Sequence, residues 1–479
     1  MSTSVIIITV AAYLLFMFAV AWMAGKGSDD SAFFTGAKKS KWYIAALAMI
    51  GAPMSGVTFV SVPGMVQASG FGYLQMCLGF VAGYLVISYV LIPLFYKLNV
   101  VSIYQYLENR FGAASYKTGA WFFFISKILG ASVRFFLVCL TLQMLVFDPL
   151  GLPFVLNVLV SVLIVFAYTF TGGVKTVIWT DSLRTLCMIL AVVLGIIFIA
   201  RGLHLDFSGL VGSVKGSGMS RIFYFDDVKV PQYFWKQFLG GLFTAVAMTG
   251  LDQDMMQRPL SCKDPRDSRK NMISSGVLQF FVVFLFLFLG VLLYRFAAAN
   301  GIAETGDKIF AAVATSGLLP GIVGVLFIVG LVASAYGAGG SALTSLTTSF
   351  TVDILGAMKK DGSKLTSTRK KVHVLMAVLM AVVIIIFNKI SNTSAINAVY
   401  TLASYTYGPI LGMFAFGLAC KKKVRDRFVP LVAILAPAIC LVLQLNSERW
   451  FGGYKFSYEI LLINAVLVIL GLCCLIRKD

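Results

Sequence analysis

Charged and metal-ligating residues are scarce in this sequence of 479 residues. Lys, Arg, Asp and Glu make up 12% of the chain, about half of their share in a typical soluble domain. The two histidines and eight cysteines form no CxxC pair and no His/Cys cluster, so the spacing of a metal site is missing. Because neither a phosphate-binding P-loop motif nor a catalytic constellation occurs, we predict no enzyme, no ATP-driven chemistry and no organic cofactor.

Apolar sequence dominates instead, since 59% of the residues are hydrophobic. Runs of about twenty apolar residues are long enough to cross a bilayer as helices. The first run follows no positively charged segment and lacks a convincing cleavage site, so we expect a retained span and no signal peptide. The sequence predicts an all-α integral membrane protein with about thirteen transmembrane helices, at residues 5–24, 42–67, 74–97, 118–146, 153–171, 180–201, 233–256, 272–298, 320–346, 372–389, 394–419, 428–445 and 457–476.

Basic residues outnumber acidic ones, with 39 Lys and Arg against 20 Asp and Glu, which gives a net charge of +19. In a soluble protein this excess would suggest nucleic-acid binding, but here the basic residues lie in short loops between apolar runs. Alternate loops hold most of them, at 38–41, 263–270, 359–371 and 421–427. Because basic loops stay in the cytoplasm, we expect a plasma (inner) membrane protein with an outside N-terminus and a cytoplasmic C-terminus. Its partner is the lipid bilayer, not nucleic acid.

One arginine, Arg134, lies near the middle of the apolar run 121–147. A charge at that depth costs at least about 2.5–3.5 kcal/mol and is tolerated mainly inside a bundle, opposite a partner. Lys127 lies one heptad earlier, on roughly the same helix face. We therefore favour a functional site on a solute or ion pathway. An arginine that only binds a neighbouring helix is the alternative.

Two predicted spans contain glycine-rich interruptions, at 51–56 (GAPMSG) and 337–340 (GAGG). Such breaks free backbone groups that hydrocarbon cannot satisfy, and they persist where they line a binding cavity. Paired interrupted helices indicate a transporter's midplane site, whereas a glycine at a close helix contact is the plainer explanation. Together with the intramembrane charges, the two breaks favour a transporter.

Six segments follow one another along the chain: 50–64 (IGAPMSGVTFVSVPG), 100–112 (VVSIYQYLENRFG), 171–181 (TGGVKTVIWTD), 249–263 (TGLDQDMMQRPLSCK), 341–355 (SALTSLTTSFTVDIL) and 405–412 (YTYGPILG). In order and spacing they resemble the sodium/solute symporter family over about residues 5–445. The resemblance implies a single transmembrane domain, 1–479, with a LeuT-type fold. Five helices in 42–201 would have an inverted copy in 233–419. An extra helix at 5–24 and two C-terminal helices at 428–476 would complete the domain.

The resemblance also implies where a solute binds. In family members that bind carboxylated sugars such as sialic acid, hydroxyls of the broken helix and an arginine of the third core helix contact the solute. Ser55, Thr58 and Arg134 match those positions. Tyr73 and Gln75, at the start of the next span, would face the same cavity. The set is chemically coherent because guanidinium pairs with carboxylate through two parallel hydrogen bonds.

For the main sodium site, the resemblance implies backbone carbonyls of Gly51, Met54 and Ser334, and two adjacent hydroxyls one turn later. This chain has Gly337 and Ala338 at the hydroxyl positions. Hard cations are bound by oxygen ligands, so two expected oxygens are missing. Sodium is the one ion that we expect as a coupling partner. If Gly337 and Ala338 do stand at the ligand positions, we expect transport to depend only weakly on sodium.

For a second sodium site, the resemblance implies Asp181 with two hydroxyls, where this chain has Gly340 and Ser341. A competing interpretation makes Asp181 the N-cap of a helix that begins near it.

Asp252 and Asp254 precede Arg258 in the segment 249–263. We expect them to form a gating or loop-anchoring ion pair more readily than an ion site.

The leading hypothesis is a secondary active transporter that imports a small polar, in one branch carboxylated, solute with sodium by alternating access. A sodium-independent uniporter or exchanger, or a proton-coupled transporter, is the alternative within the same fold. A transport-inactive membrane sensor is the alternative from another class. The sequence predicts neither the solute nor the oligomeric state.

Overall fold

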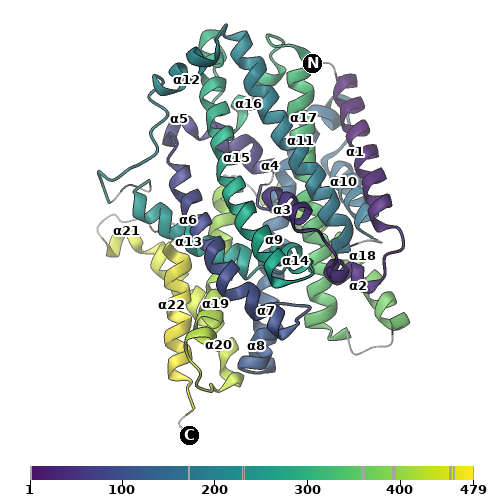
Figure 1. The fold of residues 1–479 in the computed structure, drawn as a ribbon, viewed down its shortest axis with the longest axis vertical. Coiled ribbons are helices and arrows are strands. Elements are labelled where there is room, and N and C mark those ends of the chain that lie inside the picture. The colour runs from purple at the N-terminus through teal and green to yellow at the C-terminus, as the bar shows by residue number, and fades with distance from the viewer. Residues whose placement is uncertain are drawn as a thin grey trace.

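The computed structural model describes residues 3–54, 56–170, 173–228, 230, 232–357, 362–390, 395–451, 456 and 459–477. Figure 1 shows a bundle of long helices with the N- and C-terminal ends at opposite ends of the molecule. Within these ranges the only β-structure is two isolated bridges, Ser40 with Cys262 and Val424 with Ile476. The predicted all-α fold is therefore confirmed.

The helices of the first half are α1 (Thr3–Gly25), α2 (Asp30–Thr35), α3 (Trp42–Gly51), α4 (Gly56–Gly64), α5 (Val66–Ser69), α6 (Tyr73–Val86), α7 (Ile92–Leu98), α8 (Gln105–Arg110), α9 (Ala113–Leu142), α10 (Phe154–Thr169), α11 (Gly173–Gly202) and α12 (Phe207–Lys215). Those of the second half are α13 (Phe234–Ala245), α14 (Gln253–Leu260), α15 (Pro265–Ala299), α16 (Ile309–Thr315), α17 (Gly321–Ser349), α18 (Gly362–Ile390), α19 (Ala395–Ala419), α20 (Val429–Leu445), α21 (Ser447–Trp450) and α22 (Glu459–Cys474).

Nine helical segments in the described part of the chain are long and apolar enough to cross a membrane. Three more apolar helices, α3, α10 and α22, are shorter. The predicted number of thirteen spans is therefore not confirmed, although a helix lies at each predicted position. Large apolar side chains on the outer helices are exposed, including Leu15 on α1, Leu163 on α10 and Ile434 on α20. Such surfaces suit contact with lipid.

The first predicted break is present. Helix α3 ends at Gly51 and α4 begins at Gly56, and Ala52, Pro53 and Met54 between them are not helical. Proline has no amide hydrogen to donate, and glycine lacks the side chain that restricts the backbone, so this segment leaves the helical path easily. The break lies inside the bundle, where Met54 is 1% exposed.

The second predicted break, at 337–340, is wrong because α17 is one continuous helix. Its glycines instead make room for neighbouring side chains. A Cβ on Gly337 would lie 2.5 Å from Cδ of Arg184, and a Cβ on Gly340 would lie 1.8 Å from Oη of Tyr168. The plainer explanation, glycine at a close helix contact, is therefore the one that holds.

A break that the sequence analysis missed lies in the seventh predicted span. Helix α13 passes into a π-helical turn, η5 (Val246–Gly250), and the regular helix stops at Leu251. Asp252 is extended, with φ −105° and ψ 120°, and its carboxylate accepts a hydrogen bond from the Met255 amide at 3.0 Å as the N-cap of α14. The two breaks therefore lie in the first helix of each predicted repeat, the arrangement of inverted-repeat transporters.

Helices α6 and α13 touch backbone to backbone. A Cβ on Gly79 would lie 2.1 Å from the Phe238 carbonyl oxygen, and a Cβ on Gly241 would lie 2.2 Å from the Met76 carbonyl oxygen. Small residues permit such close approach between membrane helices. This contact fixes α13, and with it the second break, against α6.

Candidate functional site

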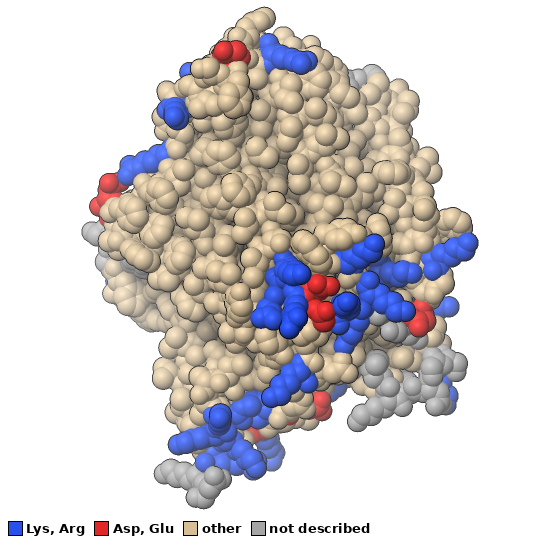
Figure 2. All heavy atoms as spheres, in the orientation of Figure 1, with Lys and Arg blue, Asp and Glu red and all other residues tan. Residues whose placement is uncertain are grey.

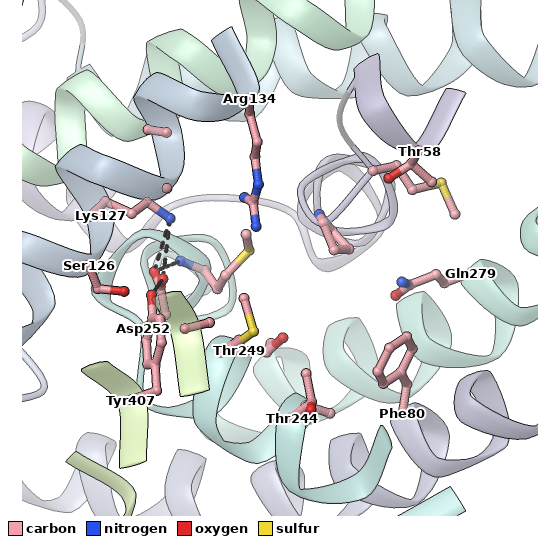
Figure 3. A pocket seen from close by; sticks show the side chains of 18 of the residues that line it. Thr58, Phe80, Ser126, Lys127, Arg134, Thr244, Thr249, Asp252, Gln279 and Tyr407 are labelled. Carbon is pink, nitrogen blue, oxygen red and sulfur yellow. Dashed lines mark hydrogen bonds and ion pairs between the residues drawn. The ribbon is translucent and has the colours of Figure 1, made fainter. Parts of the chain in front are cut away.

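A cavity lies between the two broken helices. It is lined by the break between α3 and α4 and by α4, α6, α9, α13, η5, α14, α15 and α19. Figure 3 shows it from close by, with side chains from these elements directed toward a common space. The space encloses about 920 Å³, counted together with the open solvent at its mouth.

Three of the five predicted solute-binding residues line this cavity: Thr58, Tyr73 and Arg134. Figure 3 shows the Arg134 side chain extending from α9 into the cavity, with Lys127 to one side and Thr58 to the other. Arg134 is half-buried. Ser55 lies outside the described residues, so its predicted contact stays a prediction.

Gln75 does not line the cavity and is completely buried. Its amide nitrogen donates to the carbonyl oxygens of Gly72 at 3.2 Å and Gln232 at 2.9 Å, and its amide oxygen accepts from the Tyr224 amide at 3.0 Å. These bonds attach the segment before α13 to the start of α6. The structure therefore gives Gln75 a structural role in place of the predicted solute contact.

Lys127 forms the centre of a buried ion cluster beside Arg134. Its Nζ lies 2.5 Å from Oδ2 of Asp254 and 3.2 Å from Oδ2 of Asp252. The Tyr407 hydroxyl of α19 also donates to Asp252. The break in the seventh span is thus tied to α9 and α19, and the predicted ion-pairing of Asp252 and Asp254 is confirmed.

Asp181 belongs to a second part of this cluster. Nε and Nη2 of Arg258 donate to its Oδ2 at 3.0 and 2.5 Å, and Arg258 also lies 3.5 Å from Asp254. The Ser341 hydroxyl bonds both Arg258 and Asp254. Asp181 is not an N-cap as one interpretation had it, because α11 begins at Gly173, eight residues earlier.

Several of the predicted sodium ligands already have hydrogen-bond partners or lack a side-chain oxygen. The Gly51 carbonyl accepts from the Met54 amide at 3.0 Å. Ser334 lies inside the continuous helix α17, where backbone carbonyls accept hydrogen bonds from amides four residues on. Gly337 and Ala338 supply no hydroxyl, and both Asp181 and Ser341 are bonded to Arg258. Among the residues described, no group of three or more His, Cys, Asp or Glu could hold a metal ion.

Sequence reasoning missed Arg184, Arg258 as a partner of Asp181, and Tyr407. Arg184 is 1% exposed and lies on α11, with Nη2 3.4 Å from Oδ1 of Asp181. The spacing of Asp181 and Arg184, three residues apart on a helix, was the available signal. A span predicted to begin at residue 180 puts both residues near the membrane boundary, where charges are common.

Comparison with known proteins agrees with this geometry. A family model described as "Sodium:solute symporter family" matches residues 33–426. The "Sodium/sialic acid symporter NanT" of Aliivibrio fischeri is 25% identical over 460 residues, which cover 92% of this chain and 87% of that protein. The "Sodium/sialic acid symporter SiaT" of Proteus mirabilis is 26% identical over 442 residues, 86% of this chain and 84% of that protein.

The fold has a close match among solved structures. A Na⁺-coupled sialic acid symporter in a substrate-bound, outward-open state superposes with a TM-score of 0.84 and 20% sequence identity, over 98% of this chain and 97% of that one. The likeness shows the fold, and it confirms the predicted LeuT-type architecture. Since the family model covers most of the described helices, this chain belongs to the Sodium:solute symporter family and is a multi-pass membrane transporter, not an enzyme.

Proposed function

We propose that this chain imports a small carboxylated organic solute and that Arg134 binds the carboxylate. The observation that carries the proposal is the charge of the cavity. Lys127 is paired with Asp252 and Asp254, whereas no ion pair within the described ranges includes Arg134. An anionic solute would neutralise this remaining positive charge, and a guanidinium binds a carboxylate through two parallel hydrogen bonds.

The rest of the cavity suits a polar organic body. Apolar side chains such as Phe80 and Val283 line it together with Thr58, Tyr73 and Thr249, which carry hydroxyls. A few polar groups in a mainly apolar lining orient a small solute. The relatives that are sodium/sialic acid symporters support a carboxylated sugar as the solute class, because sialic acid carries a carboxylate.

We further propose that the end of the molecule near the C-terminus faces the cytoplasm, in the plasma (inner) membrane. Figure 2 shows Lys and Arg side chains gathered over the lower part of this face, on the side of the C-terminus in Figure 1, and few near the top. Such a bias is expected of the cytoplasmic side. The N-terminus would then lie outside, and uptake would run from the top of the figure to the bottom.

Sodium is the coupling ion that membership of the family supports. Because Gly337 and Ala338 supply no side-chain oxygen, and Asp181 and Ser341 are bonded to Arg258, we assign no residue of this chain to a sodium site. Family membership therefore supports the proposal of sodium symport, and the predicted ligands do not.

The test compares binding of sialic acid with binding of a neutral sugar of similar size in the wild type, Arg134→Lys and Arg134→Ala. Losing one partner of a desolvated charge pair costs about 2–5 kcal/mol of binding free energy. We expect Arg134→Ala to lose sialic acid affinity by that amount, and Arg134→Lys to lose less.

Arg201→Ala is the matched control, because Arg201 is an exposed arginine in the last turn of α11, outside the cavity. It should bind like the wild type. If folded Arg134→Ala keeps wild-type affinity for every carboxylated sugar that the wild type binds, Arg134 does not hold the solute. If the wild type binds only neutral sugars, the proposed solute class is wrong.

A further inference from the structure

Arg184 is a buried cation with too few partners. Its side chain is 1% exposed, and none of its three guanidinium nitrogens has a hydrogen-bond acceptor among the described residues. Its one ion pair, Nη2 to Oδ1 of Asp181 at 3.4 Å, lacks hydrogen-bond geometry, since both atoms count as unbonded. Asp181 is moreover shared with Arg258. A buried charge so weakly compensated is costly and needs a reason for its position.

The position of the guanidinium is specific. It fills the crevice between the end of α3 and the middle of α17. A Cβ on Gly51 would lie 3.2 Å from Nη2 of Arg184, and a Cβ on Gly337 would lie 2.6 Å from Nη1. Arg184 therefore occupies the space that a side chain at Gly337 would need. At Gly51 the nearest obstacle is Oγ1 of Thr185, at 2.2 Å from the added Cβ, with Arg184 just beyond it.

This crevice has the character of a cation site. Gly51 is the last residue of α3, which then breaks. The C-terminal end of a helix carries partial negative charge, and the ends of broken helices hold the coupling cation in transporters of inverted-repeat construction. The crevice is also where the sequence predicted sodium, between Gly51 on one side and Gly337 on the other.

We propose that the Arg184 guanidinium is a tethered cation that takes the place of a free ion in this crevice. A sodium ion there would lie beside the guanidinium. Two like unit charges about 4 Å apart would weaken ion binding by roughly three orders of magnitude. The crevice then contributes no sodium ion to coupling, and its charge does not change during the transport cycle. Gly337 lacks a hydroxyl for the same reason, because Arg184 fills the place where it would project.

The proposal is independent of the solute, so it can be tested without one. Purified full-length wild type and Arg184→Ala are melted in 150 mM NaCl and in 150 mM KCl, and the sodium-specific rise of the melting temperature is compared. A ligand that binds only the folded state stabilises it by RT ln(1 + [L]/Kd), so tighter sodium binding raises the melting temperature further. We expect Arg184→Ala to gain a sodium-specific rise of about 1–3 °C over that of the wild type. We expect Arg184→Ala/Gly337→Ser, which adds a hydroxyl, to gain more.

Two controls separate charge from general destabilisation. Arg184→Lys keeps the cation and should show the sodium response of the wild type. Arg110→Ala removes an arginine that binds the Gly417 carbonyl, away from the crevice, and should also show no gain. A sodium response in folded Arg184→Ala no larger than that of the wild type would overturn the proposal.

A second measurement holds even if Arg184→Ala folds poorly. Gly337→Ser alone should destabilise the protein, because its side chain meets Arg184, and Arg184→Ala should relieve that loss in the double variant. If the double variant melts no higher than Gly337→Ser, the arginine does not fill the crevice as described, and the proposal fails.

Discussion

Lys127 offers the sharpest test of how the broken seventh span is held in place. Its side chain is 7% exposed, and its two carboxylate partners are 3% and 5% exposed. Replacing Lys127 with methionine keeps most of the volume but leaves Asp252 and Asp254 without their shared cation. Removing one partner of a buried ion pair typically destabilises a protein by about 3–5 kcal/mol.

The structure places the expected loss at the lower end of that range, about 3 kcal/mol. Asp254 keeps Arg258 at 3.5 Å and the Ser341 hydroxyl, and Asp252 keeps the Tyr407 hydroxyl. We therefore expect Lys127→Met to melt at least ~3 °C below the wild type. Lys97→Met, which removes an exposed lysine of α7, should change stability by no more than about 0.5 kcal/mol.

A double-mutant cycle completes the test. Asp254→Asn removes the opposite charge, so Lys127→Met/Asp254→Asn should recover part of the loss, with a coupling energy of about 1 kcal/mol or more. Melting temperatures of the four proteins at one scan rate supply the comparison. A folded Lys127→Met as stable as the wild type, or a cycle that is simply additive, would mean that the ion cluster does not hold the break.

Two further predictions concern a close glycine contact and a buried glutamine. Gly340→Ala should lower stability by roughly 1–3 kcal/mol, because its Cβ would overlap the Tyr168 hydroxyl. Tyr168→Phe in the same chain should restore part of the melting temperature, and Gly195→Ala, at a glycine with ordinary contacts, serves as the neutral control. An unchanged melting temperature for Gly340→Ala would contradict the packing described. Gln75→Leu should leave solute affinity within about threefold, because the three hydrogen bonds that it removes lie outside the cavity. It should also increase hydrogen exchange around Tyr224, whose amide loses its acceptor. A large loss of affinity with unchanged exchange would return Gln75 to the solute site.

The fold could be predicted from the sequence because its signals are local and strong. Each apolar run is long enough to mark a helix, and the proline at residue 53 inside such a run marks the first break. The glycines at 337–340 are locally ambiguous, since a break and a close contact need the same residue type. Only the neighbours Arg184 and Tyr168, from distant parts of the chain, decide between the two.

The site could be predicted in part for a similar reason. Arg134 stands alone in an apolar run, so its depth is visible in the sequence. The position of the second break depends on Asp252, whose role as an N-cap and as the partner of Lys127 and Tyr407 exists only once α9 and α19 are packed around it. Ion pairs of this kind join residues that are far apart in the sequence, so neither composition nor local pattern predicts them.

The glycine contact between α6 and α13 has a mechanical consequence. Gly79 and Gly241 each face a backbone carbonyl of the other helix, with no side chain between them. A contact without side chains has no alternative rotamers through which the two helices could slide in small steps. We therefore expect α6 and α13 to move as one rigid body during any opening or closing of the cavity. We then expect bending at the non-helical residues that follow each of the two broken helices. These residues would serve as hinges.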